Sequence, residues 1–230
     1  MKTIGLIGGM SWESTASYYQ VINETVRDAL GGLHSAKILM DSVDFADIAV
    51  HQFADDWTTC AQMIGDAALR LEQAGADFIV ISTNTMHKVA PQIAARLSIP
   101  LLHIADATAA ALREAGVRRV ALLGTQTTMV EPFYKGRLVE QGFEVLTPAP
   151  EAMAMVNHII FEELCKGIFQ DHSRQCCREI IAALTQEGAE GVILGCTEIG
   201  LLIRQEDSSV PLFDTTLIHA HEAAKMALDD

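Results

Sequence analysis

Short apolar runs alternate along the chain with longer segments whose apolar side chains recur at helical spacing. Apolar runs at 3–9 and 76–81 are typical of strands. Between them, Tyr18, Ile22 and Val26 fall four residues apart and form one face of a predicted helix. The other elements expected in the first half are a strand at 36–45, a helix at 57–75 and a helix that carries Val89, Ile93 and Leu97. Such alternation predicts an α/β fold, with parallel sheets covered by helices on both faces.

The second half of the chain repeats the first. QAGADFIVISTNT at 73–85 aligns without gaps with QEGAEGVILGCTE at 186–198, so that Thr83 stands opposite Cys196. We therefore expect two similar parallel-sheet lobes related by a pseudo-two-fold axis, with the active site between them. The expected lobes are residues 1–98 with 206–230, and residues 99–205.

Composition narrows the class of protein. The chain has 230 residues, of which 50% are hydrophobic and 20% charged, enough to bury a sizeable core. No window approaches the roughly 18 unbroken apolar residues of a membrane span, and the N-terminus lacks the features of a signal peptide. A formal charge of −14 without a basic stripe disfavours nucleic-acid binding. We expect a soluble cytoplasmic protein that acts on a small molecule, with no nucleic-acid or membrane partner.

Cysteine and histidine usage disfavours disulfides and metal sites. The five Cys form no CxxC pair, and in a cytosol they should be free thiols. The eight His form neither an HxH nor an HExxH pattern, so no metal is expected.

Two polar turns carry the candidate chemistry. STNTMHK at 82–88 and GCTEIG at 195–200 each follow a predicted strand and precede a predicted helix, and ligands of open parallel sheets bind at such strand ends. A helix N-terminus binds anions and lowers the pKa of a thiol, so Cys196 is better placed for reactivity than Cys60 or Cys165. Two opposed turns would supply the acid-base pair that racemisation needs. From the repeat alone, a purely architectural duplication is an equally good interpretation.

Other signals are weaker. GGMSWEST is not a Walker A motif and lacks the third glycine of a dinucleotide fingerprint. Its two glycines favour close approach of the backbone to a ligand, with Ser11 or Ser14 capping the following helix. His87 could donate to the site, although a capping or solvent-exposed role is an equally good interpretation.

Three segments in order along the chain, GLIGGMSWEST, TNTMHK and GCTEIGLL, resemble the aspartate/glutamate racemase family. These are cofactor-independent amino-acid racemases built from two similar α/β lobes. The family's late motif, Gly-Cys-Thr-Glu, is intact at 195–198. Glutamate racemases typically have His where this chain has Glu198, so the resemblance indicates the aspartate-like branch.

The middle motif departs from the family pattern of Cys-Asn-Thr-Ala-His. Thr83 stands where the first catalytic Cys is expected, and Ser82 is one residue out of register. A branch of the family that pairs Thr with Cys still racemises. A hydroxyl can donate a proton but is a poor base unless a neighbour activates it. The resemblance therefore implies an asymmetric catalytic pair, Thr83 and Cys196.

The resemblance also implies a mechanism. The Cys196 thiolate removes the α-proton of L-aspartate or L-glutamate, and Thr83, or a water that it holds, delivers a proton on the opposite face. Backbone N–H groups, with Asn84, Thr85 and Thr197, hold the α-carboxylate. Glu198 pairs with the α-ammonium.

The remaining site residues follow from the same resemblance. Met10, Gln52 and Lys166 line the pocket, and Lys166 is the partner of a side-chain carboxylate. Gln52 stands where the family often has a cation, which would widen specificity toward neutral polar side chains. The resemblance further implies no cofactor, pyridoxal phosphate included, and a homodimer.

Three alternatives stay open. A decarboxylase or isomerase on the same scaffold would need one Cys only, which fits the loss of the first thiol. An amino-acid-binding protein with a decayed site would bind without catalysis. A Cys hydrolase is disfavoured, because neither turn places a His in an obvious base–nucleophile arrangement.

Overall fold

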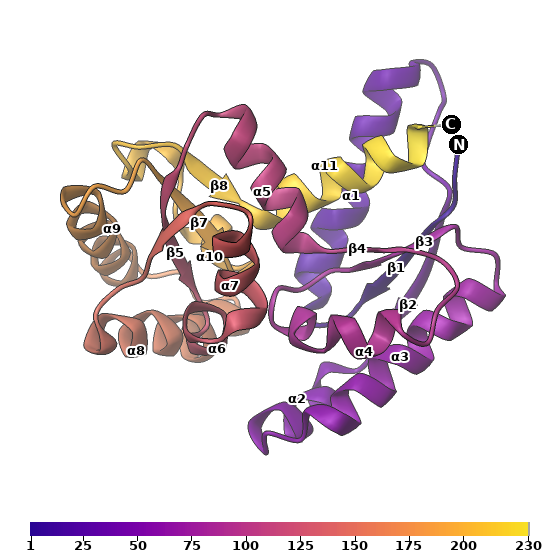
Figure 1. Cartoon of the computed structure of the whole chain (residues 1–230), viewed down its shortest axis with the longest axis horizontal. Helices are drawn as coiled ribbons and strands as arrows, with labels where there is room; N and C mark the ends of the chain where they lie inside the picture. The colour runs from indigo at the N-terminus through magenta and orange to yellow at the C-terminus, as the bar shows by residue number, and fades with distance from the viewer. Residues whose placement is uncertain (230) are drawn as a thin grey trace. The chain divides into compact units, whose positions relative to one another are not determined.

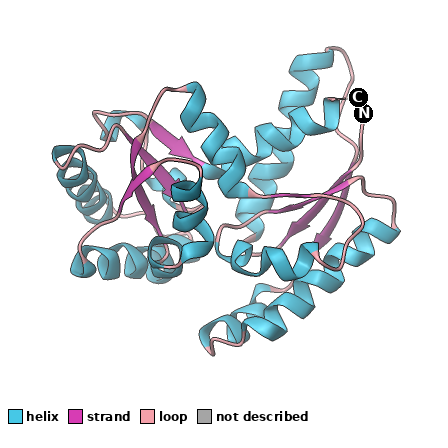
Figure 2. Cartoon of the chain, viewed as in Figure 1, coloured by secondary structure: helices cyan, strands magenta, loops and turns pink. Residues whose placement is uncertain are grey.

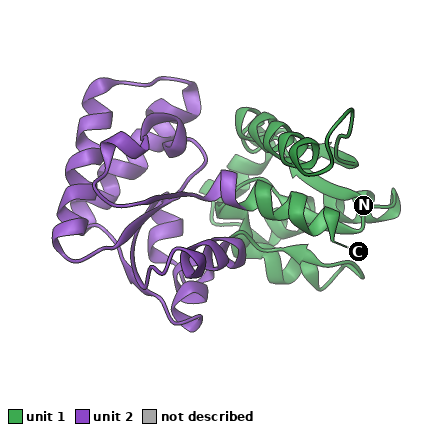
Figure 3. Cartoon of the chain, turned by 90° about the horizontal axis from the view of Figure 1, so that it is seen from above, with its two compact units in different colours: residues 1–104, 219–230 green, residues 105–218 purple. Residues whose placement is uncertain are grey.

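The computed structural model describes residues 1–229 and divides into two compact units. Unit 1 is residues 1–104 together with the C-terminal residues from His219, and unit 2 is residues 105–218 (Figure 3). Both boundaries lie later than the 98/99 and 205/206 expected from the sequence. The reason is strand pairing, because β4 completes the sheet of unit 1 and β8 completes the sheet of unit 2.

Unit 1 is built on a four-stranded parallel sheet with the order β2-β1-β3-β4. Its strands are β1 (Ile4–Gly8), β2 (Ile38–Ser42), β3 (Phe78–Ile81) and β4 (Leu101–Leu102). Its helical elements are α1 (Trp12–Leu30), α2 (Phe45–Phe53), α3 (Trp57–Gln73), the 3₁₀ helix η1 (Thr85–Val89) and α4 (Ala90–Ala94) (Figure 1). The last helix, α11 (Thr215–Leu228), crosses from unit 2 into unit 1.

Both faces of this sheet are buried, as continuous apolar strands require. Ile79 and Ile81 of β3 pack with α3 and α4, whereas Phe78 and Val80 of the same strand pack with α1 and α11. Successive strand residues point to opposite faces, so one apolar run serves two cores. The C-terminal helix thus returns to the first unit, where it contributes a stripe of alanines, Ala220, Ala223, Ala224 and Ala227.

Unit 2 repeats this topology with the strand order β6-β5-β7-β8. Its strands are β5 (Arg119–Gly124), β6 (Glu144–Leu146), β7 (Gly191–Gly195) and β8 (Leu212–Asp214). Its helices are α5 (Ile104–Glu114), α6 (Gln126–Val130), α7 (Pro132–Glu140), α8 (Pro150–His158), the π-helix η2 (Ile159–Glu163), the 3₁₀ helices η3 (Leu164–Lys166) and η4 (Gln205–Asp207), α9 (Asp171–Gln186) and α10 (Ile199–Leu202). Figure 2 shows the strands of each unit enclosed by helices. The prediction of an α/β fold with two parallel-sheet lobes is confirmed.

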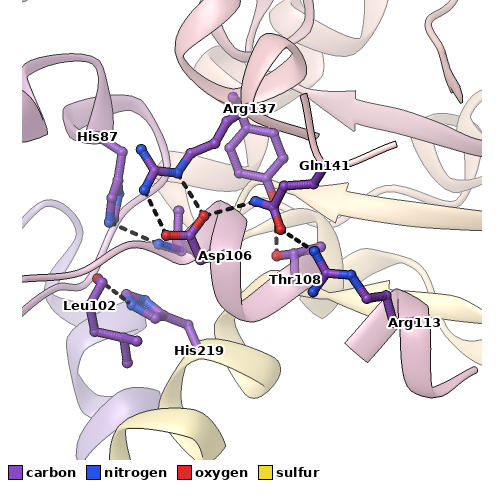
Figure 4. A network of polar contacts seen from close by, with 10 residues as sticks. His87, Leu102, Asp106, Thr108, Arg113, Arg137, Gln141 and His219 are labelled. Carbon is purple, nitrogen blue, oxygen red and sulfur yellow. Dashed lines mark hydrogen bonds and ion pairs between the residues drawn. The ribbon is translucent and has the colours of Figure 1, made fainter. Parts of the chain in front are cut away.

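A polar cluster ties α5 to α7 within unit 2. The Arg137 guanidinium donates from Nε to Asp106 Oδ1 and from Nη2 to Asp106 Oδ2, both at 2.7 Å (Figure 4). Gln141 Nε2 donates to the same carboxylate at 2.9 Å and accepts from Arg113 through its own oxygen. Such two-point pairing fixes orientation as well as distance. It holds α7 against the helix that enters unit 2.

The helix expected around Val89, Ile93 and Leu97 is shorter than its apolar spacing predicts. The segment begins as the 3₁₀ helix η1, and α4 ends at Ala94. Glu72 explains the early stop, because its Oε1 accepts hydrogen bonds from the Ser98 and Ile99 amides and turns the chain into β4. Within residues 1–229, no helix is long and apolar enough to span a membrane.

Candidate active site

The loop after β3 places Thr83 beside a buried serine. The Ser82 amide and hydroxyl both donate to the Ile7 carbonyl oxygen, at 3.0 and 2.9 Å, and Ser82 is completely buried. The Ser82 hydroxyl therefore bonds to the backbone of β1. This agrees with the interpretation that Ser82 is one residue out of register with the catalytic position of the family. Thr83 is half-buried, and its hydroxyl makes no hydrogen bond within the described part of unit 1. No base in that unit activates it.

His87 holds the backbone of this loop. Its ring is completely buried, which rules out the solvent-exposed role that the sequence left open. Nδ1 lies 2.8 Å from the Thr83 carbonyl oxygen, and Nε2 lies 3.2 Å from the Ile104 amide nitrogen. An amide can only donate and a carbonyl can only accept, so Nδ1 carries the proton and Nε2 is the acceptor. The imidazole is thus neutral, in one tautomer.

The glycine loop after β1 packs against its own chain, which corrects the interpretation of a ligand contact. A Cβ on Gly9, which has a φ of +95°, would lie 2.0 Å from the Val43 carbonyl oxygen. A Cβ on Gly8 would lie 2.3 Å from Thr15 Cγ2. Thr15 Oγ1 accepts from the Gly9 amide at 2.9 Å and lies 3.3 Å from Ser82 Oγ. The two glycines and Thr15 therefore lock this loop to the Thr83 loop.

Capping of the following helix agrees with one of the two serines named from the sequence. Ser11 is the N-cap of α1, and its hydroxyl accepts from the Ser14 amide. The Ser14 hydroxyl instead donates to the Ser82 carbonyl oxygen at 3.3 Å. This bond was not visible in the sequence, where Ser14 appeared only as an alternative cap.

The other expected residues of unit 1 lie in different settings. Asn84 and Thr85 are buried directly after Thr83, at the start of η1. Met10 is buried in the core cluster beneath α3 and follows β1, the strand that pairs with β3. Gln52 is half-buried near the end of α2, and no hydrogen bond joins its side chain to the other candidates within residues 1–229. Thr83, Asn84, Thr85 and Met10 thus share the carboxyl edge of the first sheet.

The loop after β7 places a thiol against a carboxylate. Cys196 Sγ donates to Glu198 Oε2 at 3.0 Å, and Thr197 Oγ1 donates to the same oxygen at 2.6 Å. All three residues are buried. Glu198 therefore accepts hydrogen bonds from both of its neighbours.

This arrangement reverses the expected state of Cys196. Burial raises the pKa of the thiol well above its usual 9.0, and the negative charge of Glu198 raises it further. The expectation of a thiolate stabilised by a helix N-terminus is therefore wrong for the unliganded protein. The helix that follows, α10, has only four residues, and its dipole is outweighed by desolvation and by a like charge.

Lys166 lies in η3 and pairs with Glu162 one helical turn earlier. The Lys166 Nζ to Glu162 Oε2 distance is 2.6 Å, and each side chain is 55% exposed. The ammonium group lowers the pKa of Glu162. The preceding residue, Cys165, lies near enough to Cys196 to contribute to the raised pKa of that thiol.

Asp214, at the end of β8, supports the Cys196 loop and was missed in the sequence. Its Oδ1 accepts from the Thr216 amide at 2.8 Å, and burial raises the pKa of its carboxyl group. A Cβ on Gly200 would lie 2.1 Å from Asp214 Oδ2, so the glycine admits the carboxylate beside α10. The sequence does contain a signal for Asp214, because an Asp before Thr-Thr at a strand end is typical of a helix N-cap.

Comparison with known proteins identifies the family. A family model described as Asp/Glu/Hydantoin racemase matches residues 7–223. The chain belongs to this racemase family. It is 25% identical to a broad specificity amino-acid racemase, RacX, of Bacillus subtilis, over 93% of this chain and 92% of that protein.

Solved structures agree over the whole chain of this racemase. A candidate Asp/Glu racemase from Yersinia pestis is 53% identical with a TM-score of 0.94, and the match covers 100% of both chains. An aspartate racemase homologue from Pyrococcus horikoshii is 38% identical with a TM-score of 0.86, again over 100% of both chains. Since racemases are isomerases, the protein is an isomerase.

Proposed function

We propose that this racemase inverts the α-carbon of free aspartate or glutamate without a cofactor. The observation that carries the proposal is the Cys196–Glu198 hydrogen bond, at the end of β7. Thr83 follows β3 of unit 1. This strand corresponds to β7 of unit 2, because each lies third in the strand order of its sheet. A thiol with an adjacent carboxylate can remove a proton, and a hydroxyl without one can return a proton.

The proton moves in three steps. Glu198 accepts the thiol proton of Cys196 as substrate binds, and the thiolate then takes the α-proton from the L-amino acid. Thr83, or a water that it holds, protonates the carbanion from the opposite face and is reprotonated from solvent, while Glu198 releases its proton to solvent. Backbone N–H groups, with Asn84, Thr85 and Thr197, hold the α-carboxylate while negative charge develops. In this proposal the partner of Glu198 is the Cys196 thiol and not the α-ammonium that was expected from the sequence.

The side-chain carboxylate of the substrate is proposed to bind Lys166. Lys166 must leave Glu162 to do so, and an exposed ion pair of this kind contributes only about 0–1 kcal/mol, so a substrate carboxylate can compete. Met10 and Gln52 line the same pocket in this proposal. The name of the Bacillus subtilis relative makes neutral amino acids a second substrate set to test.

The test is isotopic. Each enantiomer of aspartate, glutamate and several neutral amino acids is incubated in D₂O without pyridoxal phosphate. At early times deuterium should appear at the α-carbon of the product enantiomer. Absence of both exchange and inversion with every amino acid would refute the proposal. Gel filtration checks the homodimer that forms part of it.

One further candidate follows from the single thiol. A decarboxylase or isomerase of the same fold needs only Cys196, which would protonate an enediolate. Product analysis with malonates and with maleate separates this activity from racemisation.

A further inference from the structure

Buried histidines anchor the chain in unit 1 at both points where it passes between the units. Where the chain leaves, the Ile104 amide donates to His87 Nε2 at 3.2 Å. Where it returns, His219 Nε2 donates to the Leu102 carbonyl oxygen at 3.0 Å (Figure 4), and His219 Nδ1 accepts from the Tyr18 hydroxyl at 2.9 Å. The rings of His87 and His219 are completely buried, and their centroids lie 5.6 Å apart.

His87 differs from His219 because its second nitrogen reaches the candidate catalytic loop. Nδ1–H donates to the carbonyl oxygen of Thr83 at 2.8 Å. One imidazole therefore joins the backbone of Thr83 to the backbone of Ile104. Both bonds end on main-chain atoms, so they fix where the loop lies rather than supplying a group to a substrate.

We propose that His87 is a positioning residue for the Thr83 step of the reaction. Its Nδ1–H holds the Thr83 carbonyl oxygen, the Ile104 amide bound to Nε2 selects the tautomer in which Nδ1 is the donor, and the half-buried Thr83 hydroxyl therefore keeps one orientation toward the α-carbon. This inference rests on the proposed role of Thr83. Positional errors of about 1 Å at a reacting group can cost 10²-fold in rate, so a backbone tether of this kind is worth a measurable factor.

The surroundings keep the imidazole neutral. The ring of His103 lies 4.7 Å from that of His87, and the ring of His219 lies 5.6 Å from it. A second proton on His87 would turn Nε2 into a donor facing the Ile104 amide, which is also a donor. Burial lowers the pKa of His219, in the same cluster, to about 3.

Two isosteric variants separate the two bonds. In His87→Asn the side-chain amide nitrogen lies where Nδ1 was, so the bond to the Thr83 carbonyl is kept and the bond to Ile104 is lost. In His87→Gln the amide oxygen reaches the place of Nε2, so the Ile104 bond is kept and the Thr83 bond is lost. His219→Gln, which keeps a donor for Leu102, is the matched control in the same cluster.

The expected result is a selective loss. His87→Gln should lower kcat for racemisation about 10- to 100-fold with little change in KM, and His87→Asn should stay within a few-fold of wild type. In D₂O, His87→Gln should still exchange the α-proton of the L-substrate at the Cys196 face without inverting it. The ratio of exchange to inversion therefore rises, whereas general loosening of the fold lowers both together.

Several outcomes decide the matter. Equal kcat values for the Asn and Gln variants, or parallel loss of exchange and inversion, overturn the proposal. A wild-type protein without exchange on any amino acid refutes the proposed function instead. Nitrogen-15 NMR of the wild-type imidazole then still tests the tether, and should find the Nδ1–H tautomer. The Nε2–H tautomer overturns the proposal even if neither variant folds.

Discussion

The Thr83 and Cys196 loops have the same topological position but are built for different tasks. Cys196 faces the Glu198 carboxylate at 3.0 Å. Thr83 has no such neighbour within its own unit, and its backbone is tied to His87 instead. The two loops thus have the same place in their sheets but different polar neighbours: a carboxylate beside Cys196, and a histidine that binds the backbone of Thr83.

This asymmetry has a kinetic signature. The equilibrium constant of a racemisation is unity, so kcat/KM must be equal in the two directions. Unequal catalytic groups can therefore show only in kcat and KM separately, or in the balance between exchange and inversion. The predictions below use these quantities to break or sharpen the comparison between the loops.

Removal of the thiol should have the largest effect. Cys196→Ala takes away the group that removes the α-proton of the L-substrate, and racemisation should fall by about 10³-fold or more. Exchange of the L-substrate in D₂O should be lost as well. Cys176→Ser, at a half-buried thiol on α9, is the control and should leave both rates unchanged. Full activity in Cys196→Ala would show that the base lies elsewhere.

Neutralising the Glu198 carboxylate should have the second largest effect on racemisation. Glu198→Gln removes a charge that raises the pKa of the Cys196 thiol, so the thiolate fraction at alkaline pH should rise, as followed by ultraviolet absorbance. Racemisation should nevertheless fall about 10²-fold, because a thiolate of lower pKa is a weaker base and the proton relay is broken.

The control for this variant is Glu162→Gln, which removes the same charge from unit 2 but breaks only the exposed pair with Lys166. It should leave the absorbance of Cys196 unchanged. Wild-type activity in Glu198→Gln would mean that the 3.0 Å hydrogen bond has no part in catalysis.

Changes at Thr83 should be smaller and should affect inversion more than exchange of the L-substrate. Thr83→Val removes the hydroxyl at nearly constant shape and should reduce inversion about tenfold, while exchange of the L-substrate at Cys196 continues. Thr83→Ser keeps the hydroxyl and should resemble wild type. Thr83→Cys should make kcat and KM more alike in the two directions. Greater asymmetry in that variant would argue against Thr83 as the opposing group.

The sequence was a good guide to the fold because the two sheets are buried on both faces. Continuous apolar runs such as Phe78–Ile81 leave a strand few alternatives. The repeat also aligned Thr83 with Cys196, and the structure places each after a corresponding strand. These features depend on local sequence patterns, which can be read directly from the sequence.

What the sequence could not provide depends on burial and on distant contacts. A helix N-terminus predicts a thiolate at Cys196, but full burial and Glu198 reverse the direction of the pKa shift. The glycines after β1 appeared to serve a ligand, although their partners are Val43 and Thr15. His87 and Ile104 lie 17 positions apart, and no local pattern indicates that they are hydrogen-bonded.

The smallest expected effect concerns stability, and it contrasts a buried base in unit 1 with the buried thiol in unit 2. Burial lowers the pKa of His219 from 6.5 to about 3. As pH falls below about 6.5, the unfolded chain binds a proton at this residue and the folded chain does not. His219 therefore favours folding above that pH, and its contribution is lost progressively down to about pH 3, by up to about 1.4 kcal/mol per pH unit.

His219→Gln tests this slope. Chemical denaturation between pH 7 and pH 5 should show the stability advantage of wild type over the variant shrinking as pH falls. This window lies above the range in which Glu72 and Glu190, whose pKa values are lowered from 4.5, begin to titrate. Tyr18→Phe is the control, because it removes the hydrogen bond to Nδ1 and about 1 kcal/mol of stability but keeps the imidazole and its slope. A constant difference between wild type and His219→Gln would mean that the pKa of His219 is the same in the folded and the unfolded chain, and that the histidine cluster of unit 1 tolerates charge after all.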